Sequence, residues 1–189
     1  RSYFSVPETD PESLKNAAEL INKAKKPFIV WGQGVILGNA ESEFIKFIEK
    51  TGIPAAWTIL GLSAVPTEHP LNVGMVGMHG NYGPNVLTNE CDLLIAVGMR
   101  FDDRVTGNLN SYAKQAKIIH FEIDPAEVNK NVIADVAVLG NVKDTLNDIL
   151  NFLDKNNHKD WIAKFGEFYE IEFDKVIDRE YNKKSGGLS

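Results

Sequence analysis

The sequence predicts a doubly wound α/β domain, in which helices cover both faces of a mostly parallel, six-stranded sheet. Short runs that are apolar throughout alternate along the chain with helical patterns, and such runs are typical of parallel strands buried on both faces. Glycine-rich turns follow the runs, as expected where a strand leads into a helix. The 189 residues, 43% of them hydrophobic, suffice for one such three-layer domain with some residues to spare.

The first helix has a clear start, because Asp10 is a good N-cap and Pro11 suits the first helical position. Apolar residues then recur at helical spacing to about Lys25. Strands are expected at 27–31, 54–57, 92–97, 117–123 and 136–139, and helices at 40–50, 81–89 and 141–153.

Composition divides the chain into an N-terminal linker (1–10), the α/β domain (11–153) and a C-terminal connector helix with a linker (154–189). The connector carries an apolar stripe that packs either on its own domain or on a neighbouring one. The stripe consists of Trp161, Ile162, Phe165, Phe168, Tyr169, Phe173, Val176 and Ile177. Both ends of the chain stop abruptly, so we expect a piece of a longer protein, with 183–189 leading into a further domain.

Charge and cysteine content exclude several classes of protein. The net charge of -6 argues against nucleic-acid binding as the main function. Cys91 is the one cysteine, so there is no disulfide framework or Cys-based metal site, and we expect it to fill the core. No apolar run approaches the roughly 20 residues that span a bilayer, and no signal peptide is visible. We expect a cytoplasmic location, without a membrane or nucleic-acid partner.

A glycine loop, Gly32-Gln33-Gly34, follows the first strand, and Gly38 comes four residues after Gly34. Glycines at such a turn let the backbone approach a phosphate group. The spacing is one residue longer than the dinucleotide fingerprint, and the next strand ends without the acid that an ordinary NAD site requires. The alternative is a turn that only lets helix and strand pack.

Three later segments strengthen the case for a ligand: 74–80, 98–107 and 120–125. Arg100 and Arg104 suit an anion such as a diphosphate, and Asp102 and Asp103 could pair with them, although a solvated charged loop is the alternative. The segment 120–125 supplies an acid at a strand end, while Asp124 could equally be a helix N-cap. There is no nucleophile elbow, Walker motif or metal-ligand spacing, so we expect a binding domain without catalytic residues of its own.

Three motifs resemble the central domain of the acetolactate (acetohydroxyacid) synthase large-subunit family: GMHG at 77–80, GMRFDDRVTG at 98–107, and HFEIDP at 120–125 with Asn129-Lys130. The resemblance covers about residues 11–153. It implies a Rossmann-like, DHS-like NAD/FAD-binding fold in a thiamine-diphosphate enzyme whose central domain binds FAD. It also implies that thiamine diphosphate, Mg²⁺ and the catalytic glutamate belong to flanking domains of the same chain.

The resemblance implies FAD contacts along the whole domain. They are Gly32, Gln33 and Gly34 at the diphosphate; Thr58, Ile59 and Leu60 along the ribityl and isoalloxazine groups; Met78 and His79 at the flavin end; Gly98, Arg100, Asp102, Arg104 and Val105 at the ribityl-diphosphate; and Glu122, Ile123, Asp135 and Val136 at the adenosine. Met78 and Asp103 would also face the substrate channel, near the binding site of herbicidal inhibitors. Gln33, beside the bulky Trp31, departs from the smaller residues of many family members.

The implied reaction decarboxylates pyruvate on thiamine diphosphate and joins the product to a second 2-oxo acid, in the biosynthesis of branched-chain amino acids. The flavin would be structural. We expect the chain alone to be inactive and to bind FAD weakly or not at all, and the parent transferase to be a homodimer or tetramer with a possible regulatory small subunit.

Three alternatives remain open at this point. One is the central domain of a related enzyme such as glyoxylate carboligase, pyruvate oxidase or oxalyl-CoA decarboxylase. Another is a stand-alone dinucleotide-binding module. The third is a degenerate domain of the superfamily, retained only for contacts between subunits.

Overall fold

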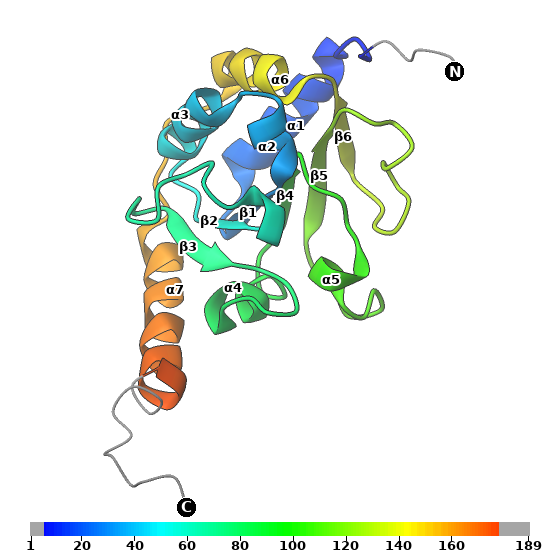
Figure 1. Ribbon diagram of the computed structural model, residues 1–189. Coiled ribbons are helices and arrows are strands. Elements are labelled where there is room, and N and C mark those ends of the chain that lie inside the picture. Colours follow the sequence, from blue (N-terminus) through cyan, green and yellow to red (C-terminus); the bar gives the residue numbers. More distant parts are fainter. Residues whose placement is uncertain (1–5, 178–189) are drawn as a thin grey trace, which may run out of the picture.

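The computed structural model describes residues 6–177 and shows a six-stranded, all-parallel sheet between two layers of helices (Figure 1). The strand order is β3-β2-β1-β4-β5-β6. The chain therefore starts in the middle of the sheet, builds outward to one edge, and returns to build the other half. This is the doubly wound order whose switch point lies between β1 and β4. The predicted fold class is confirmed.

The boundaries lie close to those expected from the sequence. The strands are β1 (Pro27–Trp31), β2 (Ala55–Trp57), β3 (Asn72–Met75), β4 (Leu93–Val97), β5 (Lys117–Glu122) and β6 (Val136–Leu139). The helices are α1 (Pro11–Lys23), α2 (Gln33–Leu37), α3 (Glu41–Thr51), α4 (Tyr82–Leu87), α5 (Asp103–Thr106), α6 (Val142–Ile149) and α7 (Lys159–Glu172), which continues as a π-helical turn (Phe173–Ile177). Every residue of β1 and β4 is buried, as expected for strands covered on both faces.

The first helix begins as its sequence predicts. The Asp10 carboxylate accepts hydrogen bonds from the backbone N–H groups of Glu12 (3.1 Å) and Ser13 (3.2 Å), and Pro11 occupies the first turn. These bonds satisfy donors that a helix start leaves without a partner in the helix.

Three elements were not located from the sequence. The short helix α2 begins at Gln33, inside the segment expected to be a glycine loop. The edge strand β3 is only partly buried along its length, so it lacks the continuous apolar run that marks the other strands, and its Gly74 falls in a stretch predicted as a turn. The short helix α5 is a single turn inside the charged segment that was expected to be a loop.

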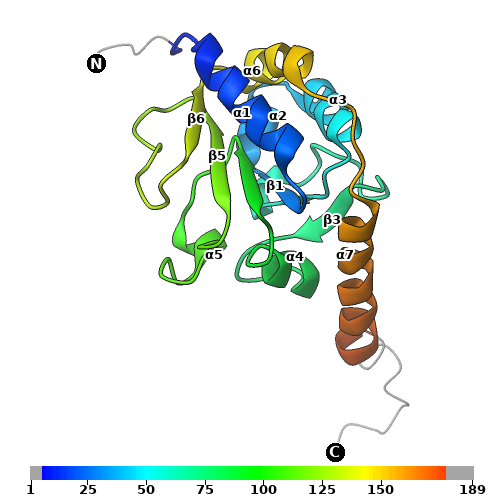
Figure 2. The same cartoon turned by 180° about the vertical axis from the view of Figure 1, so that it is seen from behind.

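Each face of the sheet has its own apolar core. Leu14 of α1, Phe44 of α3 and Leu146 of α6 belong to the core on one face. The opposite core contains Leu87 of α4 and Phe165 of α7. Figures 1 and 2 show the corresponding helices on opposite sides of the sheet.

The stripe on α7 divides into two parts. Trp161 and Phe165 are buried, and the Trp161 indole N–H donates to the Pro27 carbonyl oxygen (2.9 Å), which fixes the start of α7 to β1. Tyr169 and Val176 are 53% and 56% exposed, and α7 runs away from the sheet in Figure 1. The first part therefore packs on its own domain, while a neighbouring domain against the second part stays a prediction.

Some predictions fall outside the described residues. They concern the first part of the linker at 1–5, the side chain of Ile177, and the residues 178–189 that were expected to lead into a further domain. Within the described part of the chain, no helix is both long and apolar enough to cross a membrane.

Candidate functional site

The loops that follow the parallel strands meet at one edge of the sheet, and most of the predicted contact residues lie there. Gly32–Gly34 follow β1, Thr58–Leu60 follow β2, and the segment 98–105 follows β4. Glu122 and Ile123 stand at the end of β5. The carboxyl edge of an open α/β sheet is where such folds bind ligands, with the switch point at its centre.

At the switch point the loops after β1 and β4 touch backbone to backbone. The Gly34 N–H donates to the Gly98 carbonyl oxygen (2.8 Å). A Cβ atom on Gly34 would lie 2.6 Å from the Cα of Gly98, and one on Gly32 would lie 2.6 Å from the Gly98 carbonyl oxygen. These glycines are therefore required where the start of α2 packs against the segment after β4, whichever ligand the edge binds.

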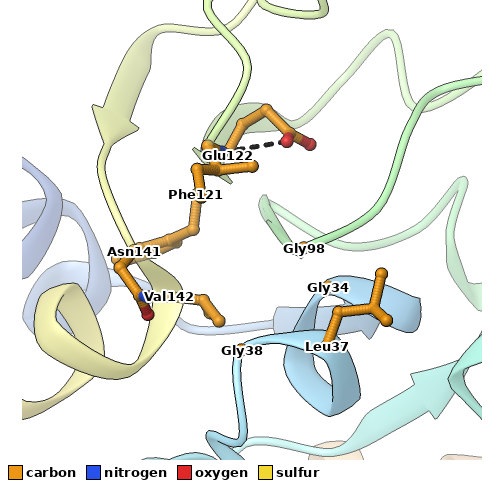
Figure 3. A pocket seen from close by; sticks show the side chains of 9 residues that line it. Gly34, Leu37, Gly38, Gly98, Phe121, Glu122, Asn141 and Val142 are labelled. Atoms are coloured by element: carbon orange, nitrogen blue, oxygen red, sulfur yellow. Dashed lines mark hydrogen bonds between the residues drawn. The ribbon is translucent and has the colours of Figure 1, made fainter. Parts of the chain in front are cut away.

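A cavity of about 270 Å³ opens beside this contact, between the ends of β1, β4, β5 and β6 (Figure 3). Its lining residues are Gly34, Leu37, Gly38, Gly98, Phe121, Glu122, Ile123, Asn141 and Val142. Small-molecule sites commonly measure 300–1,000 Å³. The cavity therefore suits one part of an extended ligand, such as a nucleoside group, while the rest would lie along the sheet edge.

Asp135 and Val136, the other residues predicted at the adenosine, do not line this cavity. Both lie at the amino end of β6, where the Asp135 carboxylate accepts a hydrogen bond from the Ile118 N–H (2.8 Å) and so closes the start of the β5–β6 pair. The residues of this segment that reach the cavity are Asn141 and Val142, at the carboxyl end of β6. The sequence could have pointed to Asn141, because it is a good N-cap residue shortly after a strand. Its side-chain oxygen accepts a hydrogen bond from the Lys143 N–H (2.9 Å).

The charged side chains of the segment after β4 have different partners from those expected. Among the described residues, neither Arg100 nor Arg104 forms an ion pair, so the expected pairing with Asp102 and Asp103 is not seen. Asp102 instead caps α5, accepting from the Arg104 backbone N–H (3.1 Å). Both arginines are exposed, so their guanidinium groups are accessible to an anionic ligand.

The loop after β3 joins this segment through one backbone contact. The Met78 N–H donates to the Arg104 carbonyl oxygen (2.8 Å), and the Met78 side chain is 66% exposed. His79 is exposed beside it, and Ile59 and Leu60 expose large apolar side chains after β2. The carboxyl edge thus has an apolar, accessible end near β2 and β3, and a cavity at the end near β5 and β6.

Glu122 stands at the rim of the cavity with a partly satisfied carboxylate. One oxygen accepts from the backbone N–H groups of Ile123 (2.9 Å) and Asp124 (3.2 Å), and the carboxylate turns away from Asn141 in Figure 3. The Asp124 carboxylate accepts from the Ala126 N–H (2.9 Å) in a turn, and the described residues between β5 and β6 form no helix, so Asp124 is not the helix N-cap that the sequence suggested.

Two other titratable residues have structural roles. Cys91 is fully buried, and burial together with the nearby Asp92 raises the pKa of its thiol to about 12, so its predicted role as a core residue is confirmed. Asp92 accepts from the backbone N–H groups of Lys25 (2.8 Å) and Lys26 (2.9 Å). The described residues contain no group of three or more His, Cys, Asp or Glu side chains that could hold a metal ion.

Comparison with known proteins decides the family. The profile of the family described as "Thiamine pyrophosphate enzyme, central domain" matches residues 14–149. The chain belongs to this family. The resemblance of motifs noted in the sequence is thereby confirmed at the level of a thiamine pyrophosphate enzyme central domain.

Relatives of this central domain carry consistent names. A "Probable acetolactate synthase large subunit" of Methanocaldococcus jannaschii is 44% identical over 86% of the chain and 27% of its own length. An "Acetolactate synthase large subunit" of Buchnera aphidicola is 36% identical over the whole chain and 33% of its own length. The chain thus spans about a third or less of these relatives.

A solved structure supports the same architecture. A Mycobacterium smegmatis protein described as a "thiamin diphosphate-dependent enzyme" matches with a TM-score of 0.68 and 27% identity. The match covers 82% of this chain and 30% of the other. This central domain thus corresponds to part of a longer enzyme in that protein.

Proposed function

We propose that this central domain serves an acetolactate synthase and that its carboxyl edge binds FAD. The observation that carries the proposal is the switch-point arrangement, where Gly34 and Gly98 meet beside a cavity and two accessible arginines follow on the same edge. The names of relatives that are 36–44% identical over most of the chain support the choice of enzyme.

The residues present fit an extended flavin dinucleotide. Gly32, Gln33, Gly34 and Gly98 would line the diphosphate, with Arg100 and Arg104 as its cations. The cavity bounded by Glu122, Ile123, Asn141 and Val142 would take the adenosine. The remaining proposed contacts are Thr58, Ile59, Leu60, Met78, His79, Asp102 and Val105, and Met78 and Asp103 would border the substrate channel.

The flavin would supply no net electron transfer to the proposed reaction, which is a decarboxylation of pyruvate followed by joining to a second 2-oxo acid. We assign thiamine diphosphate and Mg²⁺ to flanking domains of the parent chain. We also place the parent enzyme in the cytoplasm as a homodimer or tetramer that could associate with a regulatory small subunit. The exposed apolar residues Ile59, Leu60 and Tyr169 support contacts of this domain with neighbours.

Titration of the chain with FAD and with NAD tests the ligand. We expect saturable FAD binding with a Kd on the order of 10–100 µM, since the nucleotide half of the site lies within this chain. We expect no NAD binding, because no acid follows β2 at the position that holds the NAD ribose. Flavin fluorescence quenching and calorimetry would measure both. Saturable NAD binding without FAD binding would overturn the proposal in favour of another class of module.

The chain by itself should produce no acetolactate from pyruvate, thiamine diphosphate and Mg²⁺. It spans about a third or less of the relatives, and we assign the reacting groups to the rest of the parent enzyme. The measurement is a colorimetric assay of acetoin, formed from acetolactate in acid, with a complete synthase as the positive control. Turnover above the protein-free blank would contradict the assignment of catalysis to other domains.

A further inference from the structure

A buried histidine, His120, lies beside the proposed nucleotide site and is not one of the proposed ligand contacts. His120 lies in β5, two residues before Glu122, and its side chain is 0% exposed. Its ring packs edge-on against Phe101, with 5.0 Å between ring centroids, and its Nδ1 atom has no hydrogen-bond partner. A buried polar atom without a partner disfavours the folded state, so an apolar residue would fill this position at lower cost unless the other nitrogen is needed.

The other nitrogen connects two loops of the carboxyl edge. His120 Nε2 lies 2.9 Å from the Met99 carbonyl oxygen and 3.5 Å from a Glu122 carboxylate oxygen. Because a carbonyl oxygen can only accept, Nε2 carries a proton and donates it to Met99. Met99 directly follows Gly98, whose φ of +56° and close contact with Gly34 define the switch point.

We propose that His120 is a positioning residue of the nucleotide site, which holds the segment after β4 in a fixed relation to Glu122 at the end of β5. This inference rests on the proposed function. The imidazole acts on the site through its contacts with Met99 and Glu122, of which Glu122 lines the cavity. It matters for a ligand that spans both loops, such as a nucleoside diphosphate group lying between Gly98 and Glu122.

Three substitutions of His120 distinguish the effect of its hydrogen bond to Met99 from the effect of its side-chain volume. In His120→Gln the side-chain N–H lies the same number of bonds from the backbone as Nε2, so the donor can be retained. His120→Asn is one bond shorter and His120→Leu has no donor. We expect the Leu and Asn variants to bind FAD and ADP about tenfold more weakly than the unmodified chain, and the Gln variant to bind within about threefold.

Asn131→Ala is the matched control. Asn131 donates to the Phe101 carbonyl oxygen (2.7 Å), so this variant removes a hydrogen bond to the same segment from a residue with no contact to Glu122. We expect FAD and ADP binding to change by less than about threefold. Calorimetry gives the affinities, and thermal unfolding of each variant shows whether loss of binding only follows loss of stability.

The outcomes are distinct. Weaker binding in the Leu or Asn variant with rescue by Gln supports the positioning role, and either of the first two suffices if the other does not fold. Unchanged binding in the Leu variant, no rescue by Gln, or an equal loss in Asn131→Ala overturns it while the proposed function stands. Saturable NAD binding without FAD binding in the unmodified chain overturns the proposed function itself.

Discussion

Replacing Gly98 with alanine is expected to destabilise the chain by about 2–4 kcal/mol and to abolish FAD binding. Gly98 has φ +56°, a left-handed conformation that costs a residue with a Cβ atom about 1–2 kcal/mol. Its new Cβ would also lie 2.8 Å from the Cα of Gly34, so the loops after β1 and β4 would have to separate. Because both loops form the proposed diphosphate site, the same displacement removes the ligand contacts.

Gly107→Ala is the matched control for this substitution. Gly107 also has a positive φ (+57°, with ψ −127°), but nothing lies within 4 Å of the position that its Cβ would occupy. Only a conformational cost of about 1–3 kcal/mol is expected, with FAD binding unchanged. Urea unfolding and FAD titration of both variants measure the two effects. An equal loss of FAD binding in the two variants would show that the contact with Gly34 is not what the ligand requires.

Raising the pH above 9 is expected to destabilise the folded chain, by up to about 4 kcal/mol at pH 12. Burial, and then the negative charge of Asp92, raise the pKa of Cys91 from 9.0 to about 12. Above pH 9 the unfolded chain therefore releases a proton that the folded chain retains. The stabilisation is fully present below pH 9 and is lost as the pH rises toward 12. Burial also raises the pKa of Tyr112, which acts in the same direction.

Chemical unfolding measured between pH 8 and pH 11 tests this linkage. In Cys91→Ala the free energy of unfolding should fall less steeply with rising pH, because Tyr112 is then the one of these two buried groups that still titrates. A thiol reagent such as a disulfide-exchange chromophore should react with Cys91 only when the chain unfolds. A flat stability profile up to pH 11, or rapid thiol reaction in the folded chain at pH 8, would contradict the buried thiol.

The sequence predicted the elements whose signals are local. The central strands are apolar throughout because both of their faces are covered, and the N-cap of α1 combines Asp10 with Pro11. The edge strand β3 lacks this signal because it is only partly buried. Motifs in the segments 77–80, 98–107 and 120–125 indicated the family, and most of the residues assigned to FAD through them lie at the carboxyl edge.

The sequence by itself therefore determined the fold class, the order of most elements and the region of the site. Only the tertiary structure decided that Asn141, and not Asp135, reaches the cavity, because the end of the sheet at which a residue lies depends on the pairing of β5 with β6. It also decided that Asp102 caps α5 instead of pairing with an arginine, and that His120 contacts Met99. These contacts depend on how distant segments pack together, which neither periodicity nor motif spacing specifies.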